Sequence, residues 1–464
     1  MGKNKIANFV GSEKKVLGTA LTLRKFIHEP TGFEVTFVPM PGRVNKYAHF
    51  TVPYGSNFLN FRDLNYHGAS ASAATYTVPA GTAHYLEHCV FSRDEDGGML
   101  NQMAMLGFDA NAFTSNYHTE FYMSGPDFSP NGENFLTALD AYFKALMHPE
   151  ITAERVEAER KIILAEYNMY LDDPEINSYL DLMNALFKNH PQKIDICGTI
   201  ESITTMTAEN LQPAIDNFYL PNKIKLTLSG ELPEEAVLTM LDRRLSELLR
   251  LGRIVSPSEA PQPEIILPSE PFAVNLPTIT VEREVGIDAF MLGIKDPMAN
   301  PAQPLTGRQL IERRLVGQIL GEILLGDSSP SWHKLSAAGL INDSFACQYI
   351  CEPDAAFWFI CGDSHQPQSA VAALSKFLQT AELKVSPEVV AVETRAVMGS
   401  WLASLDSVGC CGSSNARLCA EGLDLADFSQ IAKEIMADLD KIIANFAYLS
   451  DEMYYCTVYV NRKD

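Results

Sequence analysis

Short stretches with alternating or continuous apolar positions predict β-strands, and one longer stretch predicts a helix. The strand-like stretches are residues 34–39, 47–52, 119–124 and 225–230. The segment from Thr152 to Leu171 is too long for a strand and is expected to be helical. Strands and helices in this mixed order are typical of an α+β fold, in which a sheet lies on one side of a layer and helices lie on the other.

A proline-rich stretch near the middle divides the chain into two parts that share an order of elements. Residues 254–271, IVSPSEAPQPEIILPSEP, contain five prolines and have neither helical nor strand periodicity, so we interpret them as an extended linker. Residues 1–253 and 272–464 then form two tandem domains. When the second part is aligned with the first, the helix start at Thr152 falls on a second helix start at Ser386, which indicates a duplicated unit.

Length and composition agree with more than one folded domain. The chain has 464 residues, and single cores stop growing near about 250–300 residues. Apolar residues make up 46% and charged residues 20%, which is typical of a globular protein. There is no apolar run of about 18 residues, and the first residues do not resemble a signal peptide. The nine cysteines are scattered and odd in number, which suits reduced thiols. We therefore expect a cytoplasmic protein.

The formal charge of −22 restricts the partners of this chain. Nucleic acid and anionic membranes would be repelled by an acidic surface, so neither is expected to bind. The charge either attracts a cationic substrate or only maintains solubility, and the sequence leaves both open.

The pentapeptide HYLEH, residues 84–88, carries the clearest chemical signal. Pro79 and Gly81 precede it, and Thr82 can cap a helix that starts beside it. Positions i, i+3 and i+4 of a helix share a face, which turns His84, Glu87 and His88 in one direction. Two such imidazoles can hold a Zn²⁺ ion at about 2.0–2.1 Å while the carboxylate takes a proton from water. The alternative is a solvated polar stripe, although this inverted order of the motif is typical of inverted zincins.

A catalytic zinc needs a third protein ligand, and the predicted helix from Thr152 offers acidic candidates. It carries four glutamates in its length: Glu154, Glu157, Glu159 and Glu166. Glu159 and Glu166 are seven residues apart and share a face with Ile162 and Ile163, so one can bind the metal while the other orients an imidazole. The remaining two are interpreted as ordinary surface acids.

Three motifs in this order resemble the pitrilysin/insulinase family of HxxEH metallopeptidases. They are VPAGTAHYLEHCVF, DANAFTSNYHTEFYM and ERKIILAEYNMYLDDPE. The similarity is greatest to the short bacterial branch of the family and to the mitochondrial processing peptidase beta subunit. It is dense before the linker and reaches the remainder through the repeat. The resemblance implies a pitrilysin-like α+β fold of two tandem homologous domains, each a mostly antiparallel sheet covered by helices.

The same resemblance assigns roles to individual residues. It implies one Zn²⁺ per chain held by His84, His88 and Glu166, with Glu87 as the general base and Glu159 supporting the histidines. The substrate is implied to lie as an added strand against the edge strand that contains Asn111, Ala112, Phe113 and Thr114. Such binding recognises an extended peptide mainly through its main chain.

The second half lacks these side chains at the repeated positions. In the alignment that sets Thr152 on Ser386, the positions of His84, Glu87, His88 and Glu166 are occupied by Gln318, Gly321, Glu322 and Ser400. No second metal site is therefore expected, and the resemblance implies that this half acts as a wall or lid. Family members carry an Arg and a Tyr there that hold the substrate carbonyls. This sequence has Ser336 and Asp343 instead, and the same alignment sets Asp109 on Asp343.

These features favour a zinc-dependent endopeptidase that cleaves short or unfolded peptides in an enclosed chamber. The missing Arg and Tyr favour the catalytic subunit of a two-subunit peptidase, whose partner is a homologous chain without zinc, or alternatively a homodimer. Two other interpretations stay open: a non-catalytic scaffold subunit, and a peptide-binding subunit that retains zinc as a structural ion.

Overall fold

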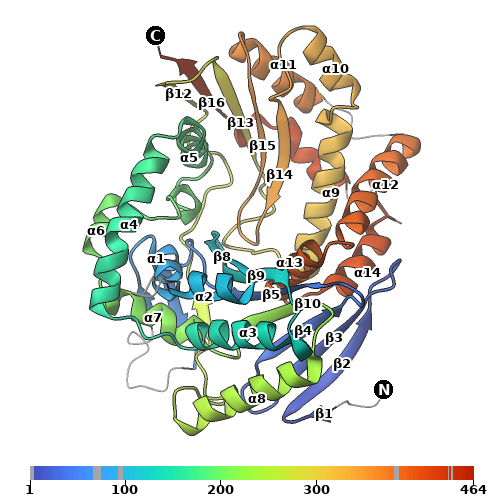
Figure 1. Ribbon diagram of the computed structural model, residues 1–464. Helices are drawn as coiled ribbons and strands as arrows, with labels where there is room; N and C mark the ends of the chain where they lie inside the picture. Colours follow the sequence, from blue (N-terminus) through green and yellow to red (C-terminus); the bar gives the residue numbers. More distant parts are fainter. Residues whose placement is uncertain are drawn as a thin grey trace. The chain divides into compact units, whose positions relative to one another are not determined.

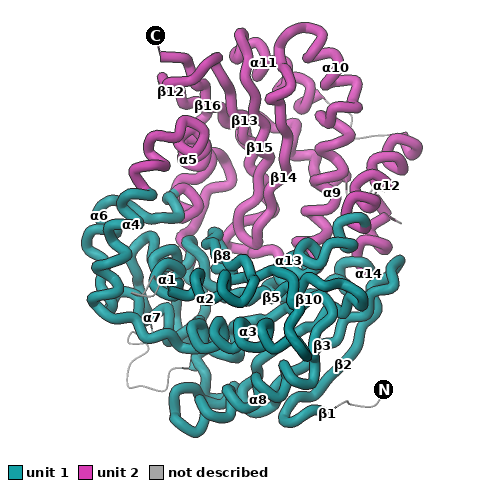
Figure 2. Tube along the Cα trace, viewed as in Figure 1, with its two compact units in different colours: residues 1–166, 194–266, 403–429 teal, residues 167–193, 267–402, 430–464 magenta. Residues whose placement is uncertain are grey.

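The computed structural model describes most of the chain and divides it into two compact units (Figures 1 and 2). The described residues are 5–65, 75–91, 98–380, 386–436, 438–439 and 443–463. Unit 1 comprises residues 1–166, 194–266 and 403–429, and unit 2 comprises residues 167–193, 267–402 and 430–464. Each unit therefore contains segments from both sides of the proline-rich linker.

An eight-stranded sheet forms the centre of unit 1. In spatial order its strands are β1 (Lys5–Ile6), β2 (Phe9–Lys15), β3 (Thr22–His28), β4 (Glu34–Pro39), β10 (Lys225–Gly230), β5 (Asn45–Val52), β9 (Thr119–Pro126) and β8 (Asp109–Thr114). Only β4 and β10 pair in parallel, and the other neighbours are antiparallel. The four predicted strands are present, each within two residues of its expected bounds.

Helices cover both faces of this sheet. They are α1 (Thr82–Val90), α2 (Gly98–Leu106), η2 (Pro130–Gly132), α3 (Glu133–Leu146), α4 (Ala153–Leu171), α6 (Ile200–Thr205), α7 (Ala208–Phe218), α8 (Glu234–Arg250), α13 (Val408–Ala420) and the start of α14 (Leu425–Ile435). Phe50 of β5 stacks on Tyr142 of α3, whereas Tyr47 of the same strand contacts Gly412 of α13. Because alternate residues of a strand point to opposite faces, α3 and α13 lie on opposite faces of the sheet.

Unit 2 is built around a five-stranded sheet. Its spatial order is β12 (Thr278–Arg283), β16 (Tyr455–Arg462), β13 (Ala289–Lys295), β15 (Ala356–Asp363) and β14 (Ala346–Cys351), and only β12 and β16 pair in parallel. The accompanying helices are α5 (Pro174–Leu186), η3 (Pro191–Lys193), α9 (Gly307–Leu325), α10 (Pro330–Ala337), α11 (Pro367–Thr380), most of α12 (Pro387–Ser404), η4 (Ala444–Ser450) and η5 (Glu452–Tyr454). The predicted α+β fold of two homologous, mostly antiparallel domains is confirmed.

Each unit is completed by a helix from the opposite half of the sequence. In unit 1, α13 packs on β5 and β10, and the Ser229 hydroxyl of β10 donates a hydrogen bond to the Val408 carbonyl at 2.7 Å (Figure 1). In unit 2, α5 packs on β13 and β16 through an apolar core that includes Leu182, Leu186 and Val458. Both units combine segments from the two halves of the sequence. The predicted domain bounds 1–253 and 272–464 therefore refer to the sequence repeat and stay a prediction.

The element bounds also correct the internal alignment. Three pairs of helices, α3 with α11, α4 with α12 and α5 with α13, start at equivalent positions of the predicted alignment. The hairpin strands do not: β14 starts at Ala346 rather than at Asp343, and β15 is displaced from β9 in the same direction by the same amount. The alignment of Asp109 with Asp343 is therefore three residues out of register, and Ala346 is the structural counterpart of Asp109.

The linker is more ordered than its composition predicted. Within residues 254–271, β11 (Pro263–Ile265) pairs with β6 (Asn60–Asp63), which in turn pairs with β7 (Thr75–Thr77). The Asn65 side chain adds a 2.8 Å hydrogen bond to the Ala260 carbonyl. Residues 263–265 of the linker thus form a strand of a third, small sheet in unit 1 rather than a free connection.

A buried ion pair fastens the end of α5 within unit 2. The Lys295 ammonium donates to Glu270 Oε1 at 2.7 Å, and the two side chains are 3% and 1% exposed. The Glu270 carboxylate also accepts hydrogen bonds from the backbone N–H groups of Lys188, Asn189 and His190. These contacts hold the segment that follows α5 against the start of the second half.

None of the helices in the described part of the chain is long and apolar enough to cross a lipid bilayer.

Candidate active site

The N-terminal cap of α1, the helix that carries the HYLEH motif, lies one residue before the predicted cap Thr82. This cap is Gly81, whose φ of 82° lies in the left-handed region that glycine favours, and no side chain caps the helix. Thr82 is instead the first helical residue, and its hydroxyl donates to the Pro79 carbonyl at 2.7 Å. The Tyr85 hydroxyl donates to the Val156 carbonyl at 2.7 Å, which fixes α1 against α4.

The structure brings the three predicted metal ligands together. Glu166 Oε2 lies 3.2 Å from His88 Nε2 and 3.7 Å from His84 Nε2. Ligand atoms at about 2.0–2.1 Å from a tetrahedral zinc are themselves separated by roughly 3.3–3.4 Å. The Glu166 oxygen thus lies at distances from both imidazole nitrogens that fit ligands of one zinc ion, and a four-coordinate site would leave a further position.

The electrostatics of the two histidines differ because their surroundings differ. Burial, and to a smaller extent the nearby His88, lowers the pKa of His84 to about 4, so its imidazole is neutral. Burial also acts to lower the pKa of His88, but its contacts with Glu159 and Glu166 outweigh that effect and raise the pKa to about 9. A zinc ion bound at His88 would therefore displace a proton from its ring.

Glu159 lies beside the ring of His88. Its side chain is only 6% exposed, and Oε2 lies 3.3 Å from His88 Nδ1, the ring nitrogen opposite the one that approaches Glu166. A carboxylate on the outer nitrogen fixes the ring and increases its basicity as a ligand. Of the two isoleucines predicted to share this face of α4, Ile163 is buried and Ile162 is 48% exposed.

Glu87 is held by the end of the edge strand. The Thr114 hydroxyl donates a hydrogen bond to Glu87 Oε2 at 2.7 Å. Burial raises the pKa of Glu87, and this hydrogen bond only partly opposes the rise. A carboxylate whose pKa is raised toward neutrality is better matched to accept a proton from water near pH 7.

The segment proposed for substrate binding is an exposed sheet edge. Asn111, Ala112, Phe113 and Thr114 form most of β8, which pairs with β9 on one side and is the last strand of its sheet. Asn111 is exposed, and Thr114 is buried at the end next to Glu87. The geometry therefore joins an available strand edge to the general-base candidate.

A cysteine that sequence reasoning missed also reaches this cluster. Among the described residues, Cys197 Sγ, a nitrogen of His84 and an oxygen of Glu166 all lie within 4.8 Å of one another. Burial, followed by the carboxylates of Asp195 and Glu166, raises the pKa of the Cys197 thiol. No helical spacing links position 197 to position 84, so only the tertiary structure reveals the proximity.

The second half provides no comparable cluster in the part that the structure describes. Gln318, Gly321 and Glu322 lie on α9, and Ser400 lies on α12. Ser336 is in α10, whereas Asp343 is exposed in a turn before β14. Asp343 lies in the stretch where the alignment of the two halves is three residues out of register.

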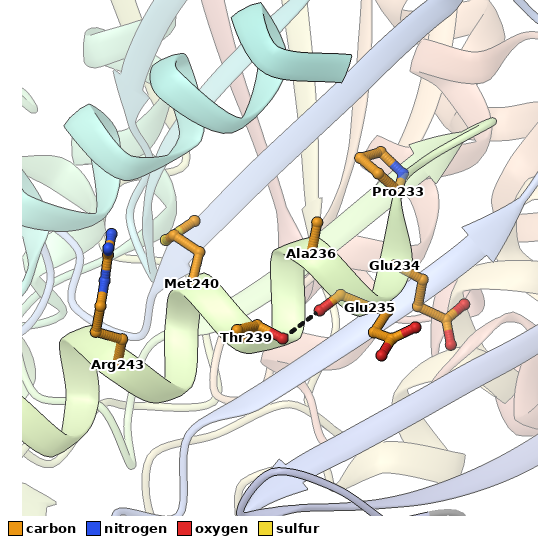
Figure 3. Close-up of a pocket in the computed structure, with 7 residues that line it drawn as sticks. All are labelled: Pro233, Glu234, Glu235, Ala236, Thr239, Met240 and Arg243. Carbon is orange, nitrogen blue, oxygen red and sulfur yellow. Dashed lines mark hydrogen bonds between the residues drawn. The ribbon is translucent and has the colours of Figure 1, made fainter. Parts of the chain in front are cut away.

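A separate surface concavity of about 670 Å³ lies along α8 (Figure 3). Its lining residues are Pro233, Glu234, Glu235, Ala236, Thr239, Met240 and Arg243. The Thr239 hydroxyl donates back to the Glu235 carbonyl at 2.7 Å, as an ordinary helix contact. No residue of the histidine and glutamate cluster lines it, so it is not part of the candidate active site.

Comparison with known proteins agrees with the fold and the motif. The sequence profile described as Insulinase (Peptidase family M16) matches residues 71–200, and that of the Peptidase M16 inactive domain matches residues 205–391. The chain therefore belongs to the insulinase family of peptidases, peptidase family M16.

Relatives within this family include proteins named as zinc proteases. The uncharacterized zinc protease YmfH of Bacillus subtilis is 27% identical over 432 residues, which cover 92% of this chain and 94% of the relative. The mitochondrial-processing peptidase subunit beta of Caenorhabditis elegans is 28% identical over 172 residues, or 36% of each chain.

Solved structures show the same fold. An M16-like peptidase from Alicyclobacillus acidocaldarius aligns with a TM-score of 0.84 at 24% identity and covers 97% of this chain and 100% of the other. Pitrilysin aligns with a TM-score of 0.64 at 15% identity, and 97% of this chain corresponds to 46% of pitrilysin. This chain thus aligns with about half of the pitrilysin chain.

Proposed function

We propose that this protein is a zinc-dependent endopeptidase that cleaves short or unfolded peptides in an enclosed chamber. The observation that carries the proposal is the convergence of His84, His88 and Glu166 at ligand-to-ligand separations, with Glu87 on the same helix face. Membership of the insulinase family and the similarity to proteins named as zinc proteases support the same activity.

The residues of the site divide the work of peptide hydrolysis among them. When bound, zinc supplies a Lewis acid that polarises the scissile carbonyl and activates water. Glu87 accepts the proton from the attacking water on its carboxylate and delivers it to the leaving amine. The Thr114 hydroxyl orients Glu87, and Glu159 orients His88. The carboxylates differ in role because they differ in burial and in hydrogen-bond partners.

The edge strand β8 supports a preference for extended peptides. A substrate strand added beside β8 would bind through its main chain and would pass Glu87 at the Thr114 end. Recognition of this kind requires an unfolded or short substrate, because a folded protein has no free strand to contribute. It also imposes few demands on the side chains of the substrate.

Glu166→Gln is expected to lower zinc affinity and peptidase activity together. Loss of an outer-shell partner alone costs about 10–100-fold in metal affinity, so loss of a direct ligand should cost at least as much. The measurements are zinc content after dialysis against a competing chelator and cleavage of a quenched peptide. Glu157→Gln is the matched control, because Glu157 is exposed on the same helix and pairs with Arg160. A full equivalent of zinc at unchanged affinity in Glu166→Gln would show that the third ligand is misassigned.

The chain is also proposed to act with a homologous subunit that lacks zinc. Residues 326–346, which include Ser336 and Asp343, contain neither Arg nor Tyr, the two residues with which a family member would hold the substrate. The single chain also corresponds to 46% of pitrilysin. A homodimer is the alternative arrangement.

The isolated chain is therefore expected to cleave peptides slowly. Poor positioning of the scissile bond costs about 10²-fold in rate, so addition of the zinc-less homologue should raise activity by a similar factor. Peptide cleavage and solution mass, measured with and without that homologue, test the proposal. Full activity of a monomer that the homologue leaves unchanged would refute the two-subunit arrangement.

A cytoplasmic location belongs to the same proposal. All nine cysteines are free in the structure, which suits a reducing compartment. The net charge of −22 supports peptide rather than nucleic acid or anionic membrane as the partner.

A further inference from the structure

The loop that carries Cys197 is fixed closely against the start of α1. A Cβ atom on Gly81 would lie 2.2 Å from the Cys197 carbonyl oxygen, and one on Gly198 would lie 2.6 Å from the Ala80 carbonyl oxygen. The Cys197 N–H also donates to Asp195 Oδ1 at 2.7 Å. Two glycines thus allow a main-chain approach that any larger residue would prevent, and the Cys197 side chain has a defined place beside His84.

The Cys197 sulfur lies close to ligand atoms of two of the proposed zinc ligands. Its sulfur, one His84 nitrogen and one Glu166 oxygen are mutually within 4.8 Å, and Cys197 is only 2% exposed. A thiolate binds zinc at about 2.3 Å, in the same tetrahedral geometry as histidine and carboxylate. The sulfur therefore lies close enough to His84 and Glu166 to share a metal ion with them.

His84 provides a second, independent observation. Its side chain is 9% exposed, and its Nδ1 atom is buried without a hydrogen bond to any described residue. A ligand histidine usually has its outer nitrogen held by a carboxylate or carbonyl, as Glu159 holds His88. No such hydrogen bond fixes the outer side of the His84 ring among the described residues.

We propose that Cys197 is a fourth protein ligand of the metal in the resting state of this site. The inference rests on the proposed zinc site. His84, His88, Glu166 and Cys197 together supply the four donors that close a tetrahedral zinc site, whereas a peptidase needs one position open for water. The resting centre is therefore self-blocked, and substrate turnover requires the sulfur to leave.

The exchange between the two states is a balanced ligand substitution. On closing, a zinc–sulfur bond forms and the bond between zinc and a water molecule breaks. The thiol proton and the released water pass to solvent. On opening, the sulfur takes up a proton as it leaves, and water returns to the vacated position. No oxidant or reductant is consumed.

Cobalt substitution tests this assignment directly. A thiolate ligand gives bound cobalt(II) an intense near-ultraviolet charge-transfer band that nitrogen and oxygen ligands do not give. We expect this band at one equivalent of cobalt in the full chain, and we expect its loss in Cys197→Ser. Cys89→Ser is the matched control, because Cys89 is also buried and directly follows His88 but is absent from the ligand cluster. The control should retain the band.

Each outcome of the cobalt experiment has a distinct meaning. One equivalent of cobalt without the band, or a band that survives in Cys197→Ser, would overturn the role of Cys197 and leave the proposed peptidase intact. Failure of the full chain to bind any metal would instead refute the proposed function on which the inference rests. X-ray absorption of the zinc-loaded, unmodified chain is a second measurement that needs no variant: zinc–sulfur scattering at about 2.3 Å is expected, and its absence would also overturn the assignment.

Peptide turnover and zinc affinity should change in opposite directions when Cys197 is replaced. Cys197→Ala removes the competing donor but keeps His84, His88 and Glu166, so peptide turnover should rise while the affinity for zinc falls. Most ligand replacements lower both quantities. A Cys197→Ala chain with unchanged zinc affinity and unchanged turnover would show that the sulfur does not reach the metal.

Discussion

Glu87→Gln is expected to reduce kcat/KM by about 10²–10⁴-fold while zinc remains bound, because general-base assistance is lost and the ligands are retained. The amide keeps nearly the shape of the carboxylate and still accepts the Thr114 hydroxyl bond through its oxygen. It lacks the basicity to take a proton from water. Cleavage of a quenched peptide and zinc content of the same preparation are the two measurements.

The control for this variant lies on the neighbouring helix. Glu154 is exposed near the start of α4, outside the histidine and glutamate cluster, so Glu154→Gln should leave rate and zinc content unchanged. A Glu87→Gln protein that cleaves at the parent rate would contradict the proposed mechanism. Loss of zinc from that variant would instead assign Glu87 to the metal's direct ligands.

Local sequence pattern predicted the parts of the site that depend on helix geometry. The spacing of His84, Glu87 and His88 and the seven-residue separation of Glu159 and Glu166 are consequences of helical periodicity, so a helix was sufficient to place them. Glu159 is buried against His88 and Glu166 approaches both histidines, as the spacing indicated. Whether these residues bind zinc stays a prediction.

Periodicity could not reveal features that arise from the packing of distant segments. Each unit contains one helix, α13 or α5, from the opposite half of the sequence. The apolar pattern of a helix does not indicate which of two sheets it covers. Cys197 reaches His84 only because Gly81 and Gly198 permit close contact between two loops. The register error at β8 and β14 has a simple cause: the segments on either side of this hairpin differ in length between the two halves, whereas the three following helix pairs keep the predicted alignment.

The largest effect on stability is expected from Lys295→Met. Removal of one partner of a buried ion pair costs about 3–5 kcal/mol, because the other charge remains buried without compensation. Lys295 donates to Glu270 at 2.7 Å and also to the carbonyls of Leu186 and Pro271. Burial lowers the pKa of Lys295 and Glu270 acts against that effect, which agrees with a charged pair held away from water. Urea unfolding of the full chain and hydrogen exchange of the unit 2 amides measure the loss of stability.

The location of the pair predicts where the loss should appear first. The Lys188, Asn189 and His190 amides all donate to Glu270, so their exchange should accelerate more than that of the unit 1 sheet. The double variant Lys295→Met, Glu270→Gln should recover much of the stability, since an uncharged replacement of both partners is often close to neutral. Lys225→Met, which breaks a partly exposed pair with Glu34, should cost no more than about 1 kcal/mol. Equal destabilisation by Lys295→Met and Lys225→Met would show that the buried pair does not hold residues 188–190 in place.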